Sequence, residues 1–287
     1  MNIFLLDIAE NRIQLLPLTY TRSIGELRVG ILKIKEKWEL RLEMKSSIIT
    51  EEYLGKNSPK DANSNLVINS CICPDDTLVA LILKLKEGQK LMNKGKFIAA
   101  KTSLQPKYGD AFIDNFDSMN YVEKVTYIER PQDIFARNGE QIRIDFEFLT
   151  KGRKSAKIKD PYSKIYNKES IFLEEGVDLK ACILNAENGP IYLGKNSIVS
   201  EGAIIKGPFA LGEYAEVSMG AKIRGDSTFG SYTKVGGEVK NSVVMDYSNK
   251  GHDGYLGNSV IGEWCNLGAD TNTSNMKNNY TSVKIWD

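Results

Sequence analysis

The sequence predicts an α/β amino-terminal domain followed by a three-sided parallel coil of six-residue repeats. Short apolar runs alternate with helical patterns over residues 1–150, which is typical of an α/β domain. From Leu193 onward an apolar residue recurs at every sixth position. The stretch between them, "KGRKSAKIKDPYSKI", is basic and polar and contains a proline. We therefore predict a domain over 1–150, a linker over 151–170 and a repeat domain over 171–287.

Buried strands are predicted in the amino-terminal domain at "MNIFLLDI", "SSIIT", "NLVINSCI" and "KFIAA". Two helical patterns lie between them. In the first, apolar residues share one helical face between Ile24 and Trp38. In the second, within "DDTLVALILKLKEGQKLM", Asp75 and Asp76 are suited to begin the helix. Strands that alternate with helices indicate a largely parallel sheet.

The carboxy-terminal half is predicted to be a coil whose apolar positions stack along one axis. The leading position of each repeat is occupied by Leu193, Val199, Ile205, Leu211, Val217, Ile223, Phe229 and Val235. After an interruption the pattern returns, led by Tyr255, Ile261, Leu267 and Thr273. A period of six suits a short strand followed by a tight corner, so three repeats close one triangular turn. A looser version, "IFLEEGVDLKACILNAENGPIYLG", is predicted to form the first coils or a cap.

The bulk composition excludes several classes of protein. Lysines and arginines number 38 against 37 acidic residues, which argues against a nucleic-acid or anionic-membrane partner. No apolar stretch is long enough to span a membrane, and "MNIFLLDIAEN" lacks the basic start of a signal peptide. The four cysteines lack metal or redox spacing, so we expect reduced structural thiols. A soluble, cytoplasmic protein is the expectation.

A candidate phosphate-binding loop lies between the first strand and the first helical pattern. The stretch "PLTYTR…ELRVG" contains Thr21, Arg22 and Arg28 near a predicted strand end and helix start. Hydroxyls, exposed N–H groups and arginine forks are the groups that bind phosphate. The alternative is that both arginines are solvated surface charges.

The repeats resemble the hexapeptide repeats of left-handed β-helices, and the left hand is inferred from that resemblance. The order of the two domains resembles sugar-1-phosphate nucleotidyltransferases, particularly the family of the bifunctional N-acetylglucosamine-1-phosphate uridylyltransferase/glucosamine-1-phosphate acetyltransferase. More closely, "LLPLTYTR…LRVGILKIKEKW" and "NKGHDGYLGNSVIGEWCNLGADTNTSN" resemble a Bacteroidetes-type family of sugar nucleotidyltransferases. The resemblance covers nearly the whole chain. It implies a Rossmann-related, nucleotidyltransferase-like domain before the β-helix.

The resemblance implies transfer of a nucleotidyl group from a nucleoside triphosphate to a sugar-1-phosphate in nucleotide-sugar biosynthesis. Mg²⁺ would neutralise phosphate charge in that reaction. Where the family has a metal-binding aspartate after a central strand, this chain has Asn69, so we assign no metal ligand. Thr21 and Arg22 are the recognisable remainder of the family's phosphate loop.

An acyltransferase activity is a second implication of the resemblance. His252, the only histidine, precedes "YLG" as the family's general base does, and acetyl-CoA would be the co-substrate. A neutral imidazole suits proton removal from an attacking amine. The family's substrate contacts correspond to Lys240, Tyr255, Asn266 and Asn275. The alternative is that His252 is an inconsequential loop residue.

Three functions therefore remain open: nucleotidyl transfer, acyl transfer to an amino sugar phosphate, and a degenerate sugar-nucleotide-binding or assembly module without turnover. Sugar phosphate and nucleoside triphosphate are the expected partners, and the resemblance implies a homotrimer. The family continues with further coils beyond Asp287. We therefore expect either a partner that covers the carboxy-terminal end of the coil or a chain truncated relative to its family.

Overall fold

The structure, a computed structural model, describes residues 1–54, 64–109, 114–273 and 276–282. By its internal contacts the chain divides into two compact units. The amino-terminal unit comprises Met1–Leu27 and Leu32–Pro131, and the β-helix unit comprises Arg28–Ile31 and Gln132–Asp287. Within the described ranges, no helix has the length and apolar character needed to cross a membrane.

The amino-terminal unit is built on one mixed sheet with the strand order β2-β1-β3-β6-β5-β7. Its strands are β1 (Asn2–Leu6), β2 (Ser46–Ile49), β3 (Asn65–Asn69), β5 (Gln89–Asn93), β6 (Lys96–Thr102) and β7 (Asp117–Asn120). β1 is parallel to β2 and β3, and β6 runs antiparallel to its neighbours β3 and β5. The short strands β4 (Ile72–Cys73) and β8 (Thr126–Tyr127) pair separately. The α/β prediction is confirmed, with strands at the four predicted apolar runs.

The helices of this unit differ from the sequence prediction in two places. They are α1 (Ala9–Gln14), α2 (Ile34–Leu42), α3 (Asp76–Ile82) and the 3₁₀ turns η1 (Leu18–Tyr20) and η2 (Ile24–Glu26). The helix predicted over 24–38 is wrong before Ile34, because the chain is irregular after η2 and Gly30 has a φ of +81°. The second predicted helix ends at Ile82, and its last part is strand β5. Its start is confirmed, since the Asp75 carboxylate accepts a hydrogen bond from the Leu78 N–H at 2.8 Å.

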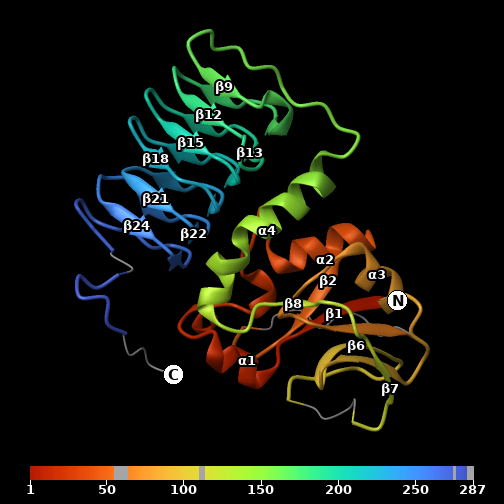
Figure 1. The fold of residues 1–287 in the computed structure, drawn as a ribbon. Coiled ribbons are helices and arrows are strands. Elements are labelled where there is room, and N and C mark those ends of the chain that lie inside the picture. The colour runs from red at the N-terminus through yellow and green to blue at the C-terminus, as the bar shows by residue number, and fades with distance from the viewer. Residues whose placement is uncertain (55–63, 110–113, 274–275, 283–287) are drawn as a thin grey trace. The chain divides into compact units, whose positions relative to one another are not determined.

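The β-helix unit has three faces, each a parallel sheet (Figure 1). The first face contains β10 (Ile171–Leu173), β13 (Ile191–Leu193), β16 (Phe209–Leu211), β19 (Ser227–Phe229), β22 (Val243–Val244) and β25 (Val260–Ile261). The second face contains β11 (Asp178–Leu179), β14 (Ile198–Val199), β17 (Glu216–Val217), β20 (Lys234–Val235) and β23 (Asn249–Lys250). The third face contains β9 (Lys164–Tyr166), β12 (Ile183–Asn185), β15 (Ile204–Lys206), β18 (Lys222–Ile223), β21 (Glu238–Lys240) and β24 (Tyr255–Gly257).

The predicted apolar axis is confirmed. Val199 pairs with Val217, and Val217 pairs with Val235, in adjacent coils of the second face. All three side chains have 0% exposure and belong to one hydrophobic core. The arrangement is consistent with a left-handed β-helix. After the interruption, however, Leu256 rather than Tyr255 occupies the axis, because Leu256 pairs with Val239 and Tyr255 with Glu238.

Aromatic residues occupy one corner of the β-helix in a left-handed conformation that glycine and asparagine more often adopt. Tyr214, Tyr232, Tyr247 and Trp264 follow first-face strands in successive coils, each with a φ between 55° and 61°. Their rings stack with centroid separations of 5.0, 5.3 and 4.5 Å. The two preceding coils have Gly176 and Asn196 at this corner, both also with positive φ. The same corner of the β-helix thus has glycine or asparagine in its first two coils and stacked aromatic residues in the four that follow.

Three further elements of the β-helix unit were not predicted. The long helix α4 (Pro131–Thr150) belongs to this unit from Gln132 onward. Strand β9 and the 3₁₀ turn η3 (Lys168–Ser170) lie in the segment 151–170, which was expected to be a linker. β9 pairs in parallel with β12, so the third face begins within that segment.

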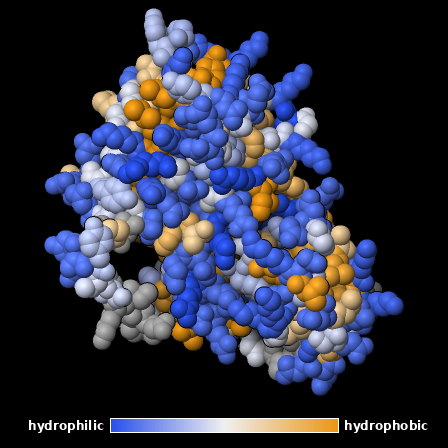
Figure 2. Space-filling model, in the orientation of Figure 1, coloured by the Kyte–Doolittle hydropathy of each residue, from blue (hydrophilic) through white to orange (hydrophobic). Residues whose placement is uncertain are grey.

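The face of the molecule seen in Figure 2 is mostly hydrophilic, and three of the four cysteines are buried. On the face shown in Figure 2, hydrophilic residues cover most of the surface and hydrophobic residues form separate patches. Cys71, Cys73 and Cys182 are buried, Cys265 is exposed, and all four are free thiols.

Candidate functional site

Polar side chains meet at the carboxyl ends of the parallel strands β1 and β2. Asp7 follows β1 and Thr50 follows β2, and the Thr50 hydroxyl donates to the Asp7 carboxylate at 2.6 Å. The Ile24 N–H donates to the same carboxylate at 3.2 Å. Open α/β sheets bind ligands outside this edge. The carboxylate of Asp7 thus fixes the start of η2 beside that edge.

Asp7 is almost fully enclosed, with 1% exposure. Burial raises the pKa of its carboxyl above the ordinary value, and hydrogen bonds from Thr50 and Ile24 and the charge of Arg12 act in the opposite direction. The Arg12 guanidinium lies 3.1 Å from the Asp7 carboxylate. A buried acid that already has these partners is suited to hold a loop in place.

Arg12 fixes the predicted phosphate loop. Its guanidinium donates to the carbonyls of Thr19 and Arg22 at 2.7 and 3.2 Å and to the Thr50 hydroxyl at 3.0 Å. The Thr19 hydroxyl donates in return to the Arg12 carbonyl at 2.6 Å. Sequence reasoning missed Arg12 and Asp7. The available signal was their position, since Asp7 directly follows the first strand and Arg12 lies in the helix that comes next.

Thr21 and Arg22 lie together on the loop that Arg12 holds. The Thr21 side chain is exposed, Arg22 is partly exposed, and the Arg22 guanidinium donates to the Thr21 hydroxyl at 3.4 Å. A hydroxyl and a guanidinium side by side can both donate to phosphate oxygens. The structure thus brings these two predicted residues together at the strand edge.

Arg28, the third predicted phosphate ligand, lies in the β-helix unit. Its guanidinium donates to the Asp246 carboxylate at 2.9 and 3.3 Å and to the carbonyl of Ile31. The residue is 7% exposed. These contacts favour a structural anchor over a phosphate ligand.

The described residues of the amino-terminal unit do not fit a protein-held Mg²⁺ ion. The Asn69 amide donates to the Phe97 carbonyl at 3.0 Å and accepts from the Cys71 N–H at 2.9 Å. Asp75 caps α3, and Asp76 lies 3.4 Å from Arg41. Across the described part of the chain, no group of three or more His, Cys, Asp or Glu side chains could hold a metal.

In the β-helix unit, His252 lies in the loop between β23 and β24 and is exposed. Its carbonyl accepts a hydrogen bond from the Lys250 ammonium at 2.5 Å. Among the described residues its imidazole has no hydrogen-bond partner. The ring is therefore available to a substrate.

The structure places the other predicted β-helix residues on two different faces. Lys240 and Tyr255 both lie on the third face, where Lys240 pairs with Gly257 and Glu238 with Tyr255. Asn266 forms an isolated bridge with Asn249 and so continues the second face. Asn275 lies outside the described residues. The His252 loop leads from β23 on the second face to β24 on the third face. β24 is the strand that pairs with β21, which contains Lys240.

Lys240 belongs to a cationic groove on the third face. The groove has a volume of about 510 Å³ and is lined by Asn188, Lys206, Lys222, Arg224, Glu238 and Lys240. Arg224 pairs with Glu238 at 2.8 Å. The three lysines have no ion-pair partner among the described residues. The groove therefore has an excess of positive charge, which suits a phosphate group.

Three of these cations occupy one outward row, and sequence reasoning missed two of them. The register places Ile205 beside Ile223 and Ile223 beside Val239, so the next residues, Lys206, Arg224 and Lys240, follow one another across adjacent strands. The signal is visible in "IIKG", "KIRG" and "EVKN", where a cation precedes each corner. Like charges on adjacent strands repel. A bound anion would relieve that repulsion.

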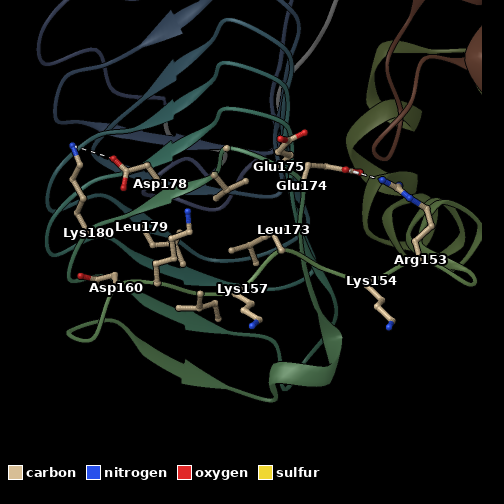
Figure 3. Close-up of a pocket in the computed structure, with 15 residues that line it drawn as sticks. Arg153, Lys154, Lys157, Asp160, Leu173, Glu174, Glu175, Asp178, Leu179 and Lys180 are labelled. Atoms are coloured by element: carbon tan, nitrogen blue, oxygen red, sulfur yellow. Dashed lines mark hydrogen bonds and ion pairs between the residues drawn. The ribbon is translucent and has the colours of Figure 1, made fainter.

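A second cavity, of about 890 Å³, lies at the first coil of the β-helix (Figure 3). Residues 153–160 border it on one side and residues 173–180 on the other. Arg153 pairs with Glu174 at 2.7 Å, and Lys180 with Asp178 at 3.5 Å. Lys154, Lys157 and Lys159 also line the cavity and have no ion-pair partner among the described residues, so positive charge is not confined to the third-face groove.

The architecture is that of a two-part protein, an α/β unit followed by a β-helix, with a polar loop at the edge of the sheet where open α/β sheets bind ligands. Comparison with known protein families agrees: the chain belongs to the sugar nucleotidyl transferase family, whose model matches residues 3–154, more than half of the chain. The β-helix proper lies outside that match. No curated protein matches the chain.

Proposed function

We propose that the protein is a sugar-1-phosphate nucleotidyltransferase, which transfers a nucleotidyl group from a nucleoside triphosphate to a sugar-1-phosphate and releases pyrophosphate. Family membership supports a transferase of this kind. The observation that carries the proposal is the position of Thr21 and Arg22 on a loop held at the carboxyl edge of the parallel strands. Nucleotide-sugar biosynthesis is the process in which this reaction belongs.

The chain's own residues would act mainly by positioning. A phosphate oxygen of the sugar-1-phosphate attacks the α-phosphorus, a new P–O bond forms, and the bond to the pyrophosphate leaving group breaks. Arg22 would donate to phosphate oxygens as charge develops, and the Thr21 hydroxyl would orient the same group. Mg²⁺ would arrive with the nucleotide, since the described residues do not supply a carboxylate cluster for it.

The test is a pyrophosphate-release assay with nucleoside triphosphates and sugar-1-phosphates in matched pairs, with Mg²⁺ in the buffer. We expect release with one pair, and a decrease of on the order of 100-fold in kcat/KM for Arg22→Ala. Arg137→Ala, on the exposed side of α4, is the matched control and is expected to retain wild-type activity. The absence of pyrophosphate from every pair would rule out the proposal.

Acyl transfer is a second candidate function, favoured by the exposed imidazole of His252 and the cationic groove that contains Lys240. Neutral His252 would take a proton from an attacking amine, an N–C bond would form, and the thioester C–S bond of acetyl-CoA would break to release the thiol. Lys240 would hold the phosphate of the amino sugar as a point charge. Tyr255, Asn266 and Asn275 stay predicted substrate contacts.

This candidate is tested by release of free thiol from acetyl-CoA with an amino sugar phosphate. His252→Ala is expected to abolish release, and Lys240→Gln to raise the KM for the phosphate substrate. Lys195→Gln, at an exposed position between the first and second faces, is the control. Binding of nucleotide or sugar phosphate without turnover in either assay would favour the degenerate binding module instead. Light scattering would test the proposed homotrimer in the same preparation.

A further inference from the structure

Three cations follow one another across the outer side of the third face of the β-helix. Lys206 and Lys240 end β15 and β21, and Arg224 directly follows β18, the strand that lies between those two (Figure 1). The Arg224 N–H donates to the Val239 carbonyl at 2.8 Å, so the backbone ladder continues as far as these residues. We call Lys206, Arg224 and Lys240 the cation row.

The charges of the cation row oppose the stability of the sheet. Neighbouring strands are about 4.8 Å apart, so like charges on them repel. On the second face the corresponding neighbours attract, because Glu216 is in register with Lys234 and the two side chains pair at 3.1 Å. Charge complementarity between strands is thus available to this unit and is absent from the cation row. An anionic ligand would supply it.

The cation row lines the groove of about 510 Å³ together with Lys222, Glu238 and Asn188. Four cations therefore face a single carboxylate in this groove. Glu187 lies near the Lys206 end, but its carboxylate accepts from the Asn185 amide at 3.0 Å, and it is not among the residues that line the groove. The groove has a net positive charge within one unit of the protein.

The groups of the cation row are free to bind a ligand. The Arg224 guanidinium donates to the Glu238 carboxylate at 2.8 Å, and the arginine side chain is 57% exposed. A guanidinium has five N–H donors, so this contact orients the group and leaves other donors available. Among the described residues, the ammonium groups of Lys206 and Lys240 have neither a hydrogen-bond partner nor an ion-pair partner.

We propose that the cation row is a binding site for a diphosphate group. Three cations in a row leave two gaps between neighbours, and one phosphoryl group can occupy each gap. Arg224, in the middle, would donate to both phosphoryl groups, and Lys206 and Lys240 would each bind one of them from outside. A single phosphate would fill one gap and leave the other two cations facing each other. The number of gaps therefore favours a diphosphate over a monophosphate.

The diphosphate site goes beyond both functions proposed above. The acyl-transfer candidate assigns a single phosphate to Lys240, whereas the diphosphate site needs the whole cation row. Free inorganic pyrophosphate and the diphosphate of a nucleotide sugar share the chemistry that the row would recognise. They are the leaving group and the product of the proposed nucleotidyl transfer. Only this choice of sources rests on the proposed function, since the site itself is inferred from the β-helix unit alone.

The experiment is isothermal titration calorimetry of the full chain, without Mg²⁺, with inorganic pyrophosphate, inorganic phosphate and uridine diphosphate glucose. We expect pyrophosphate to bind on the order of 10-fold more tightly than phosphate, and Lys206→Gln and Lys240→Gln each to weaken pyrophosphate binding by about 10-fold. Lys195→Gln is the matched control, because it removes one exposed charge outside the groove. Arg22→Ala is titrated as well, because the loop of Thr21 and Arg22 also offers donors to phosphate.

Thermal unfolding separates a binding role from a structural one. Removing one cation relieves repulsion in the row, so ligand-free Lys206→Gln is expected to unfold at the wild-type temperature or slightly above it. Pyrophosphate should raise the unfolding temperature of the wild type more than that of this variant. A lower unfolding temperature without ligand, together with an unchanged affinity for pyrophosphate, would make Lys206 a structural residue and reject the site.

The outcomes also separate the diphosphate site from the proposed nucleotidyl transfer. Pyrophosphate binding that survives Arg22→Ala and weakens in the lysine variants supports the site, even in a protein that releases no pyrophosphate in the activity assay. Uridine diphosphate glucose that depends on the same lysines supports the nucleotide sugar as the source, and its failure to bind supports free pyrophosphate. Equal affinities for phosphate and pyrophosphate, no binding of pyrophosphate, or binding that only Arg22→Ala removes would overturn the site.

Discussion

Lys250 lies in register with Val235 on the inner side of the second face, at the end of a column of valines. Its side chain is 2% exposed, and its ammonium donates to the carbonyls of His252 and Gly236 at 2.5 and 3.5 Å. An ionised group therefore replaces a methyl group on the apolar axis, next to the only histidine. Its hydrogen bond holds the backbone of the His252 loop.

Replacing Lys250 with methionine is expected to stabilise the protein at neutral pH by on the order of 1 kcal/mol, because a buried charge gives way to an apolar chain of similar length. Burial lowers the pKa of Lys250. Between that lowered pKa and the ordinary lysine value the unfolded chain binds the extra proton, so wild-type stability rises with pH there. Urea unfolding from pH 7 to 10.5 measures both effects.

The matched control for this prediction is Lys195→Met, at an exposed corner position. That change is expected to leave the free energy of unfolding within about 0.5 kcal/mol of the wild type. A wild-type protein whose stability shows the same pH profile as Lys250→Met would contradict the assignment of the profile to this ammonium.

Truncation of two adjacent isoleucines on β15 is expected to lower the free energy of unfolding by very different amounts. Ile205 faces the axis with 0% exposure, whereas Ile204 points outward with 41% exposure. Ile205→Ala leaves a cavity in the stacked core and should lower the free energy of unfolding by about 2–5 kcal/mol. Ile204→Ala should change it by less than about 0.5 kcal/mol. Equal losses for the two variants, measured by chemical denaturation, would contradict the inward and outward assignment.

The aromatic corner yields a prediction about backbone conformation. Tyr232 stacks on both Tyr214 and Tyr247 and has a φ of 56°. Tyr232→Ala should lower stability by about 1–3 kcal/mol through the two lost ring contacts. Tyr232→Gly should be more stable than the alanine variant by about 1 kcal/mol, because glycine adopts the left-handed conformation without strain. Thermal unfolding compares them, with the unstacked, exposed Tyr162→Ala as the control.

The β-helix could be predicted because each coil repeats one physical requirement. An apolar side chain must point to the axis once in every six residues, and Val199, Val217 and Val235 display that requirement directly in the sequence. The phase first shifts at Val239, four residues after Val235, and after the interruption the pattern restarts at Leu256 and not at Tyr255. The loop before Leu256 has no such periodic constraint, so its length could not be predicted from the repeat.

Helix α4 could not be predicted for a related reason. Its buried residues include Asn138, Gln141 and Asp145 as well as Ile134 and Ile142. Asn138 and Asp145 accept hydrogen bonds from the Gly30 and Ile31 N–H groups, so polar residues occupy part of the buried face that an apolar pattern would mark. The helix predicted over 24–38 was wrong for the opposite reason. Ile24, Leu27 and Ile31 are buried as a helical face would be, but an irregular chain buries them.

The candidate site was predictable only where its residues are neighbours in sequence. Thr21 and Arg22 are adjacent, and the structure keeps them together. Asp7 and Thr50 are 43 positions apart and meet only because β1 and β2 are parallel neighbours. The partnership of Arg28 with Asp246 spans 218 positions, and no local pattern indicates it. Tertiary contacts of this kind decide which arginines stay available to a ligand.

The four free cysteines allow a test of the burial pattern in both units. Burial raises the pKa of the Cys71 and Cys182 thiols, which lowers their thiolate content, whereas Cys265 is exposed. Since the thiolate is the reactive form, a thiol reagent should modify one cysteine rapidly in the native protein and all four in denaturant. Cys265→Ser should remove the rapid phase and leave the slow one. Rapid modification that survives this substitution would show that Cys71, Cys73 or Cys182 reaches solvent, and would contradict the packing of its unit.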